Sequence, residues 1–228
     1  MIINCFLPCR SGSQRLPNKN IRAIAGFQYG LIEIKLRQLS EVRTINSIVL
    51  STDDPEIIRF AASLNIAKLI IHKRADCLAT NQTSTDNLIM HASELIKQGH
   101  ILWTHVTSPF LTAGTYQEII KKYFAVVKEG YDSLMTTTLL KNFVWDDNGP
   151  VNYDRNIEKW PRTQTLKPLY EVNSAVFIAS AKIYNQMQDR IGIKPYFYPL
   201  DKIRGTDIDW PEDFKVAEAL LNSKIANV

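Results

Sequence analysis

Three cations lie close together near the start of the chain: Arg10, Arg15 and Lys19. Guanidinium and ammonium groups neutralise phosphate charge, and a cluster of them suits a polyphosphate. Small residues, whose backbone N–H groups can approach a phosphate, lie among them: Ser11, Gly12 and Ser13. A solvated basic turn is the alternative. However, the apolar run just before the loop predicts a buried strand, and ligands bind at the loops that follow such strands. We therefore expect this loop to bind phosphate.

Two acidic residues near the other end of the chain, Asp207 and Asp209, are separated by one residue. In an extended segment, residues two apart face the same side, so both carboxylates can face one point. Magnesium prefers hard oxygen ligands and commonly takes one or two carboxylates, with substrate phosphates and water as the remaining ligands. Taken alone, the pair fits helix capping and surface acids before Pro211 equally well. Together with the cationic loop, it predicts a Mg²⁺ site at Asp207 and Asp209.

The segments that must position these groups alternate between two kinds. Short apolar and β-branched runs predict strands at residues 2–8, 47–51, 67–71, 101–106, 133–138 and 171–179. Segments of helical period predict helices at residues 31–39, after Asp54-Pro55, and at 86–97, 116–127, 181–187 and 211–221. Such alternation is typical of an α/β domain with a largely parallel sheet. Residues 141–170 lack a sustained period and are rich in aromatic and turn residues, so we interpret them as an insertion.

Composition limits the classes of protein that remain. Of 228 residues, 45% are hydrophobic and 22% charged, without an internal repeat or linker, which predicts a single globular domain over residues 1–228. A net charge of +4 is too small to indicate nucleic acid binding. No apolar run approaches the roughly 18 residues of a membrane span, and Asn4 and Arg10 interrupt the apolar start too early for a signal peptide. We expect a cytoplasmic protein without a nucleic acid or membrane partner.

Two kinds of common site are not indicated. The three cysteines form no CxxC pair, so neither a disulfide framework nor a zinc site is predicted, and Cys5 and Cys9 are expected to be buried thiols. Neither GxxxxGK[ST] nor GxGxxG follows the first strand, which argues against a P-loop ATPase and a dinucleotide dehydrogenase.

A larger set of motifs occurs in order along nearly the whole chain. These are Arg10-Ser11-Gly12-Ser13, Leu16-Pro17, Lys19-Asn20, Ser51-Thr52-Asp53-Asp54-Pro55, Arg74, Leu78-Ala79-Thr80, Thr107-Ser108-Pro109, Arg162, Gln164, Asn173 and Asp207-Ile208-Asp209. In this set the chain resembles the acylneuraminate cytidylyltransferases, also called CMP-sialic acid synthetases. The resemblance implies a Rossmann-like nucleotidyltransferase fold with a mostly parallel sheet flanked by helices. It also implies that residues 141–170 are a dimerisation insertion and that the protein is a homodimer.

The resemblance further implies an activity and roles for individual residues. The activity is transfer of CMP from CTP to the anomeric hydroxyl of a sialic-acid-like 2-keto sugar acid, with release of pyrophosphate. The implied nucleotide-binding residues are Arg10, Ser11, Gly12, Ser13, Arg15, Lys19, Asn20, Arg74, Thr83 and Thr85. The implied sugar-binding residues are His105, Arg162, Gln164 and Asn173. Catalysis would fall to Arg10, Lys19, Asp207 and Asp209, of which the two aspartates would bind Mg²⁺.

The chain departs from the family pattern at several positions. The family usually has Gln-Pro-Thr-Ser-Pro-Leu-Arg, whereas this stretch begins with His105 and ends with Leu111. The family glutamine is a sugar contact, so His105 bears on the choice of acceptor. Gln14 stands where lysine is frequent, and Asn81 where aspartate is common.

Three other interpretations stay open. Metal-dependent glycosyltransferases also use an Asp-x-Asp motif, but usually in the middle of the chain. A nucleotide-binding module that has lost catalysis would agree with the changes at His105 and Leu111. CMP-Kdo synthetases share an Arg-x-x-Ser-x-Arg-Leu-Pro-x-Lys pattern with the first loop, whereas Asn20 after Lys19 favours the sialate group.

Overall fold

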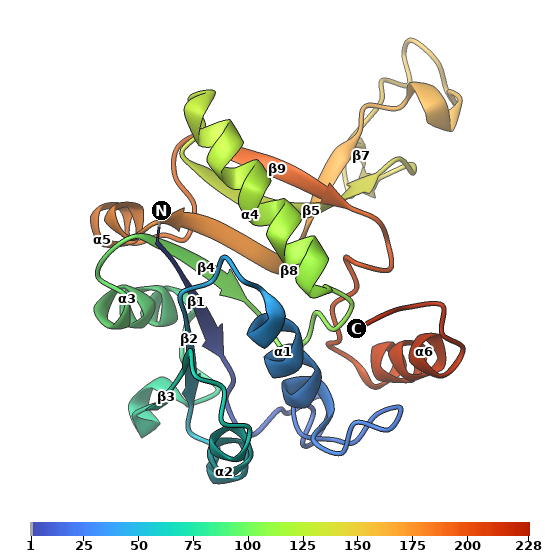
Figure 1. The fold of residues 1–228 in the computed structure, drawn as a ribbon. Coiled ribbons are helices and arrows are strands. Elements are labelled where there is room, and N and C mark those ends of the chain that lie inside the picture. Colours follow the sequence, from blue (N-terminus) through green and yellow to red (C-terminus); the bar gives the residue numbers. More distant parts are fainter. Residues whose placement is uncertain (1) are drawn as a thin grey trace.

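The computed structural model describes residues 2–228 and is built around a seven-stranded sheet with helices on both faces (Figure 1). Its strand order is β3-β2-β1-β4-β8-β5-β9. The strands are β1 (Ile3–Pro8), β2 (Ser47–Thr52), β3 (Leu69–Lys73), β4 (His100–Thr104), β5 (Ser133–Leu140), β8 (Leu169–Ser180) and β9 (Pro195–Leu200). All neighbouring pairs are parallel except the two that involve β8. The predicted α/β class with a largely parallel sheet is confirmed.

The helices cover the two faces unequally. One apolar layer includes residues from α1 (Gly30–Glu41), α2 (Pro55–Ser63), α4 (Ala113–Lys128) and α6 (Pro211–Asn222). The other includes residues from α3 (Thr85–Leu95) and α5 (Ala181–Met187). Successive side chains of a strand point to opposite faces, and accordingly Cys5 and Leu7 of β1 pack in the first layer and Phe6 in the second. No helix within residues 2–228 combines the length and apolarity needed to cross a membrane.

Helix starts follow the capping chemistry of the sequence. Asp54 Oδ1 accepts hydrogen bonds from Glu56 N at 2.8 Å and Ile57 N at 3.3 Å, and Pro55 begins α2, as expected. Ser84, Thr112 and Ser180 cap α3, α4 and α5 in the same way. The caps of α3 and α4 explain why these two helices begin one and three residues earlier than expected.

Two features of the sheet differ from the expectation. Strand β9 was not among the expected strands. It contains Pro195 and Pro199, which are tolerated because β9 lies at the edge of the sheet. Strand β3 lies two residues further along the chain than expected.

The predictions that Cys5 and Cys9 are buried thiols are both confirmed, and Cys77 is exposed.

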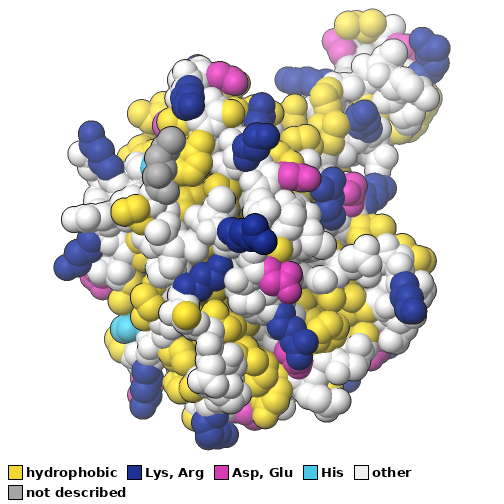
Figure 2. Space-filling model, viewed as in Figure 1, with side chains coloured by type: hydrophobic (Ala, Val, Ile, Leu, Met, Phe, Trp, Pro, Cys, Tyr) yellow, Lys and Arg dark blue, Asp and Glu magenta, His cyan; other side chains and the backbone are white. Residues whose placement is uncertain are grey.

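The expected insertion forms an arm that extends away from the sheet (Figure 1). It contains a short hairpin, β6 (Trp145–Asp146) with β7 (Gly149–Pro150), and a 3-10 turn, η2 (Thr163–Thr165). The arm exposes large apolar side chains, including Ile157, which is 86% exposed, and Trp160, which is 63% exposed. Figure 2 shows hydrophobic side chains on the arm and around its base.

Helix α1 carries a lysine on its buried face. Lys35 is fully buried, and its Nζ donates hydrogen bonds to Ser108 O and Tyr116 Oη, both at 2.7 Å. Its hydrogen-bond partners are neutral oxygens. Because burial disfavours the charged form, the pKa of Lys35 falls from 10.5 to about 7.

This buried amine makes stability depend on pH. Between the folded pKa of about 7 and the unfolded value of 10.5, the unfolded chain binds a proton that the folded chain does not. The free energy of unfolding should therefore rise with pH in this window, by at most about 1.4 kcal/mol per pH unit. We expect urea denaturation from pH 7 to pH 9 to show this rise relative to a Lys35→Met variant, which lacks the titrating group. Parallel pH profiles of the two proteins would contradict the assignment.

Candidate active site

The carboxyl ends of β1 and β4 lie side by side in the sheet. From β1 the chain crosses through α1 to β2 on one side, and from β4 it crosses through α4 to β5 on the other side. This change of direction is a topological switch point, where open α/β sheets bind ligands. A cavity of about 380 Å³ lies there, lined by residues from 8–20 and 105–107.

The cationic loop meets Asp209 of the acidic pair beside this cavity. Arg15 Nη2 and Lys19 Nζ both lie 3.1 Å from Asp209 Oδ1. Lys19 Nζ also donates to Ile208 O at 2.8 Å. Groups that lie about 190 residues apart in the sequence therefore form one charged cluster.

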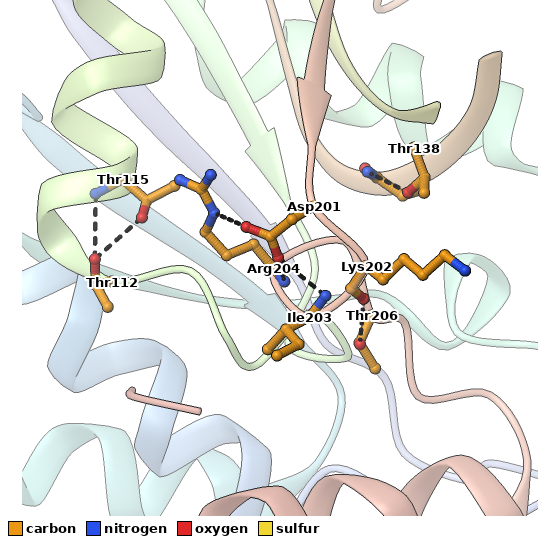
Figure 3. A network of polar contacts seen from close by, with 9 residues as sticks. Thr112, Thr115, Thr138, Asp201, Lys202, Ile203, Arg204 and Thr206 are labelled. Atoms are coloured by element: carbon orange, nitrogen blue, oxygen red, sulfur yellow. Dashed lines mark hydrogen bonds and ion pairs between the residues drawn. The ribbon is translucent and has the colours of Figure 1, made fainter. Parts of the chain in front are cut away.

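The segment 201–206 holds the acidic pair in place. The Asp201 carboxylate accepts hydrogen bonds from Ile203 N at 3.0 Å, and from Arg204 N at 2.9 Å and Nε at 2.7 Å (Figure 3). Gly205 lets this turn approach the sheet closely, because a Cβ there would lie 2.6 Å from Thr138 Oγ1. The chain then continues directly to Asp207.

Two further contacts fix the backbone on either side of Asp209. Ile208 is buried, and its N–H donates to Thr107 O at 2.9 Å. The Asp213 carboxylate, in the first turn of α6, accepts from Asp209 N at 2.9 Å and Trp210 N at 2.7 Å. The position of the Asp209 carboxylate is thus set by buried packing and a helix cap.

The donor set fits a hard divalent cation. Asp207 Oδ1 is a buried atom without a hydrogen-bond partner within residues 2–228, and burial raises the pKa of this carboxyl group. A carboxylate oxygen in that state suits a cation, and carboxylate oxygens are ligands that magnesium prefers. The described part of the chain contains no cluster of three or more His, Cys, Asp or Glu residues that could hold a metal. The other ligands would then be phosphate oxygens and water.

Polar contacts within the first loop and with neighbouring segments fix its conformation. Ser11 N donates to Asp53 Oδ1 at 2.9 Å, and Ser11 Oγ bonds to the same carboxylate. Asn20 Nδ2 donates to Arg10 O at 2.9 Å, whereas Asn20 Oδ1 is buried without a partner among the described residues. The Arg10 side chain reaches Asn81. Gly12 adopts a φ of 67°, which favours glycine.

The cavity is lined by only part of the residues assigned to the nucleotide. Five of those ten line it: Arg10, Ser13, Arg15, Lys19 and Asn20. Arg74 is buried beneath the loop, where its guanidinium donates to Ser51 Oγ at 3.0 Å and Ser51 O at 2.6 Å. Thr83 bonds to Thr80, and Thr85 is exposed at the start of α3.

The residues assigned to the sugar are dispersed. His105 lines the cavity. Asn173 is buried in β8, where its amide bonds to Thr136 Oγ1 at 2.8 Å and Thr138 Oγ1 at 3.2 Å. Arg162 and Gln164 are exposed at the η2 turn of the arm, and neither lines the cavity. One copy of the chain therefore brings only His105 of these four to the cavity.

Two residues with clear structural contributions were given no role in the sequence analysis. Asp53 orients the loop through Ser11, and it follows a β-strand within a quoted motif. Lys35 anchors the segment after β4 through Ser108. The available signal for Lys35 was a single lysine within the apolar face of α1.

Comparisons with known proteins agree with this arrangement. The family model described as Cytidylyltransferase matches residues 4–225. The N-acylneuraminate cytidylyltransferase of Streptococcus agalactiae is 26% identical over 92% of this chain and 51% of its own length. The pseudaminic acid cytidylyltransferase of Campylobacter jejuni is 24% identical over 95% of this chain and 94% of its own. The chain spans about half the length of several curated relatives that it matches.

The fold is also shared with a solved structure. CMP:2-keto-3-deoxy-manno-octonic acid synthetase complexed with CTP superposes with a TM-score of 0.70 at 15% identity, covering 98% of this chain and all of that one. This similarity confirms the predicted nucleotidyltransferase fold.

Proposed function

Because this chain belongs to the cytidylyltransferase family, we propose that it transfers CMP from CTP to the anomeric hydroxyl of a sialic-acid-like 2-keto sugar acid and releases pyrophosphate. The observation that carries this proposal is the meeting of Arg15 and Lys19 with Asp209 beside the cavity at the switch point. Binding a triphosphate requires cationic side chains that neutralise its charge, and binding the accompanying metal ion requires carboxylate ligands. The relatives named for N-acylneuraminate and pseudaminic acid support the class of acceptor.

The cationic loop would bind and orient the triphosphate. Arg10, Arg15 and Lys19 would neutralise negative charge on the phosphates and on the departing pyrophosphate. In phosphoryl transfer the protein has little covalent chemistry to perform. Alignment of the acceptor hydroxyl with the α-phosphorus therefore supplies much of the rate acceleration. Asp53 and Asn20 would keep the loop in its binding conformation through Ser11 and Arg10 O.

Asp207 and Asp209 would hold Mg²⁺. When bound, the ion would supply Lewis acidity and fix the phosphates in place. Asp207 has a second role in the proposal, because a carboxylate oxygen that the ion leaves free can accept the proton of the acceptor hydroxyl.

The direct test is pyrophosphate release. Purified protein with CTP and Mg²⁺ is given N-acetylneuraminic, legionaminic, pseudaminic and Kdo-type acids in turn, and each product is identified by mass. We expect pyrophosphate and a CMP-sugar with a nine-carbon acid. Turnover with the Kdo-type acid alone would favour the CMP-Kdo alternative. Stabilisation by CTP without pyrophosphate from any acid would favour a binding module.

We further propose a homodimer formed through the arm. Arg162 and Gln164, which the family resemblance assigns to the sugar, lie at the η2 turn of the arm and do not line the cavity of the same chain. The exposed Ile157 and Trp160 supply apolar surface for an interface. We expect light scattering to give twice the chain mass of 26.0 kDa, and an Ile157→Asp, Trp160→Ser double variant to be monomeric. A wild-type monomer at micromolar concentration would refute the proposal.

A further inference from the structure

A tryptophan at the end of β4 contacts the histidine in the cavity wall. Trp103 Nε1 lies 2.7 Å from His105 Nε2. An indole nitrogen can only donate a hydrogen bond, so His105 Nε2 must accept it. An imidazole nitrogen that accepts carries no proton, and the proton of a neutral ring must then be on Nδ1.

The tryptophan has little freedom to change this contact. Trp103 is completely buried, and its ring lies 4.8 Å from the ring of Phe6. The Arg190 guanidinium stacks over Phe177 at 3.7 Å and lies 5.4 Å from the Trp103 ring. Burial and the contacts with Phe6 and Arg190 therefore hold the indole N–H toward His105.

The surroundings also keep the His105 ring neutral. Burial lowers the pKa of His105 to about 3, and the positive charges of Arg190, Lys19 and protonated Lys35 act in the same direction. Asp209 is the one acidic neighbour that opposes them among the residues described. The doubly protonated ring, which has no acceptor to offer Trp103, is thus disfavoured at neutral pH.

The remaining nitrogen faces an environment where a ligand can reach it. His105 lines the cavity together with Arg10 and Lys19. Within residues 2–228, Nδ1 forms no hydrogen bond, and it is not among the buried polar atoms that lack a partner. Nδ1 is therefore not sealed from solvent, and the cavity is the hollow that His105 lines.

We propose that Trp103 fixes His105 as the Nδ1–H tautomer and that this N–H donates a hydrogen bond to an oxygen of the acceptor sugar acid. The second half rests on the proposed function. Glutamine, the usual family residue here, offers both a donor and an acceptor, whereas this ring offers only a donor. The site should therefore select an acid with an acceptor oxygen, a carboxylate or carbonyl, at that place. An acid with only a donor or apolar group there would leave the N–H unpaired.

The tautomer can be measured without any substrate. In long-range ¹H–¹⁵N NMR spectra of the ¹⁵N-histidine-labelled full chain, each of the four histidines gives its own pattern. The His105 signals are assigned by their loss in the His105→Asn variant. We expect the Nδ1–H pattern, unchanged from pH 6 to pH 8. An Nε2–H pattern or an imidazolium would overturn the tautomer assignment whatever the enzyme's activity.

Substitutions then test the contact with the acceptor. In His105→Asn the amide nitrogen lies near the place of Nδ1, whereas His105→Leu has no donor. We expect His105→Leu to raise the KM of the acceptor about tenfold, the cost of one lost hydrogen bond, with the KM of CTP unchanged. His105→Asn should stay within about threefold of the wild type.

A Trp103→Phe variant tests whether Trp103 fixes the tautomer of His105. Trp103→Phe keeps an aromatic ring but removes the donor, so the NMR pattern of His105 should change to a mixture of tautomers. The KM of the acceptor should rise, with kcat nearly constant.

The His105→Leu variant decides whether His105 contacts the acceptor. Equal effects of this substitution on the KM values of CTP and acceptor, or none on either, would overturn the proposed hydrogen bond from His105 to the acceptor.

Discussion

Asp209→Asn is expected to lower kcat at least about a hundredfold with little change in melting temperature. Asp209 is the carboxylate on which Arg15 and Lys19 converge, and it is one of the two proposed ligands of Mg²⁺. Asparagine has nearly the same shape but no charge. Loss of one charged contact at a site of phosphoryl transfer costs about 3 kcal/mol of transition-state stabilisation, which is about two orders of magnitude in rate.

Stability should hardly change, for reasons visible in the structure. The Asp209 side chain is 42% exposed and that of Arg15 is 46% exposed, and ion pairs at such positions contribute little to folding. The backbone at this point is held by Asp213 and by the buried Ile208, which the substitution does not touch. Activity and stability should therefore separate.

The measurement is pyrophosphate release at saturating CTP and acceptor, together with thermal unfolding. Glu212→Gln is the matched control, because it removes one negative charge in the first turn of α6 from an exposed side chain. We expect the control to keep nearly full activity. Turnover of Asp209→Asn within a few fold of the control would show that the acidic pair is not at the reacting centre.

Local chemistry explains why much of the fold was predictable. The strands β1, β2 and β4 are short apolar runs, and α2 begins with the Asp54 cap and Pro55 at its first turn. Each of these signals lies within a few residues. The cationic loop was predicted to bind ligands because it follows a buried strand, and the structure places it at the switch point.

Other features of the structure depend on long-range packing, which the local sequence does not reveal. The roles of Lys35 and Asp53 depend on contacts with Ser108 and Ser11, which lie far away in the sequence. Strand β9 forms at an edge that accepts its prolines, which a local pattern cannot reveal. The bond from Trp103 to His105 was closer to detection, because residues two apart at a strand end face the same side.

The separate placement of the sugar-assigned residues has the same origin. Asn173 lies beneath the Gly205 turn, where it supports the approach to Asp207. Arg162 and Gln164 lie on the arm, and the sequence of residues 141–170, which has no sustained period, does not predict where the arm points.

Gly30→Ala is expected to destabilise the protein more than Gly26→Ala or Gly114→Ala. Gly30 begins α1 with a φ of +55°, and a Cβ there would lie 2.0 Å from Arg22 O. The obstacle is backbone, so no side chain can move aside. Strain in the left-handed region and overpacking each cost about 1–3 kcal/mol. We expect the free energy of unfolding to fall by about 3 kcal/mol or more, and the melting temperature by about 6–12 °C.

Gly30→Ala should also disturb the conformation of the cationic loop. Ile32 N donates a hydrogen bond to Asn20 O at 3.0 Å, and this bond joins the start of α1 to the loop. Two controls separate the causes. Gly26→Ala has a φ of +90° with open space around the Cβ, so it should show the strain alone. Gly114→Ala, within α4, would meet only Thr112 Oγ1 at 3.7 Å and should be neutral or stabilising by up to about 1 kcal/mol. A melting temperature for Gly30→Ala equal to that of Gly26→Ala would mean that the helix and the loop are not in close contact.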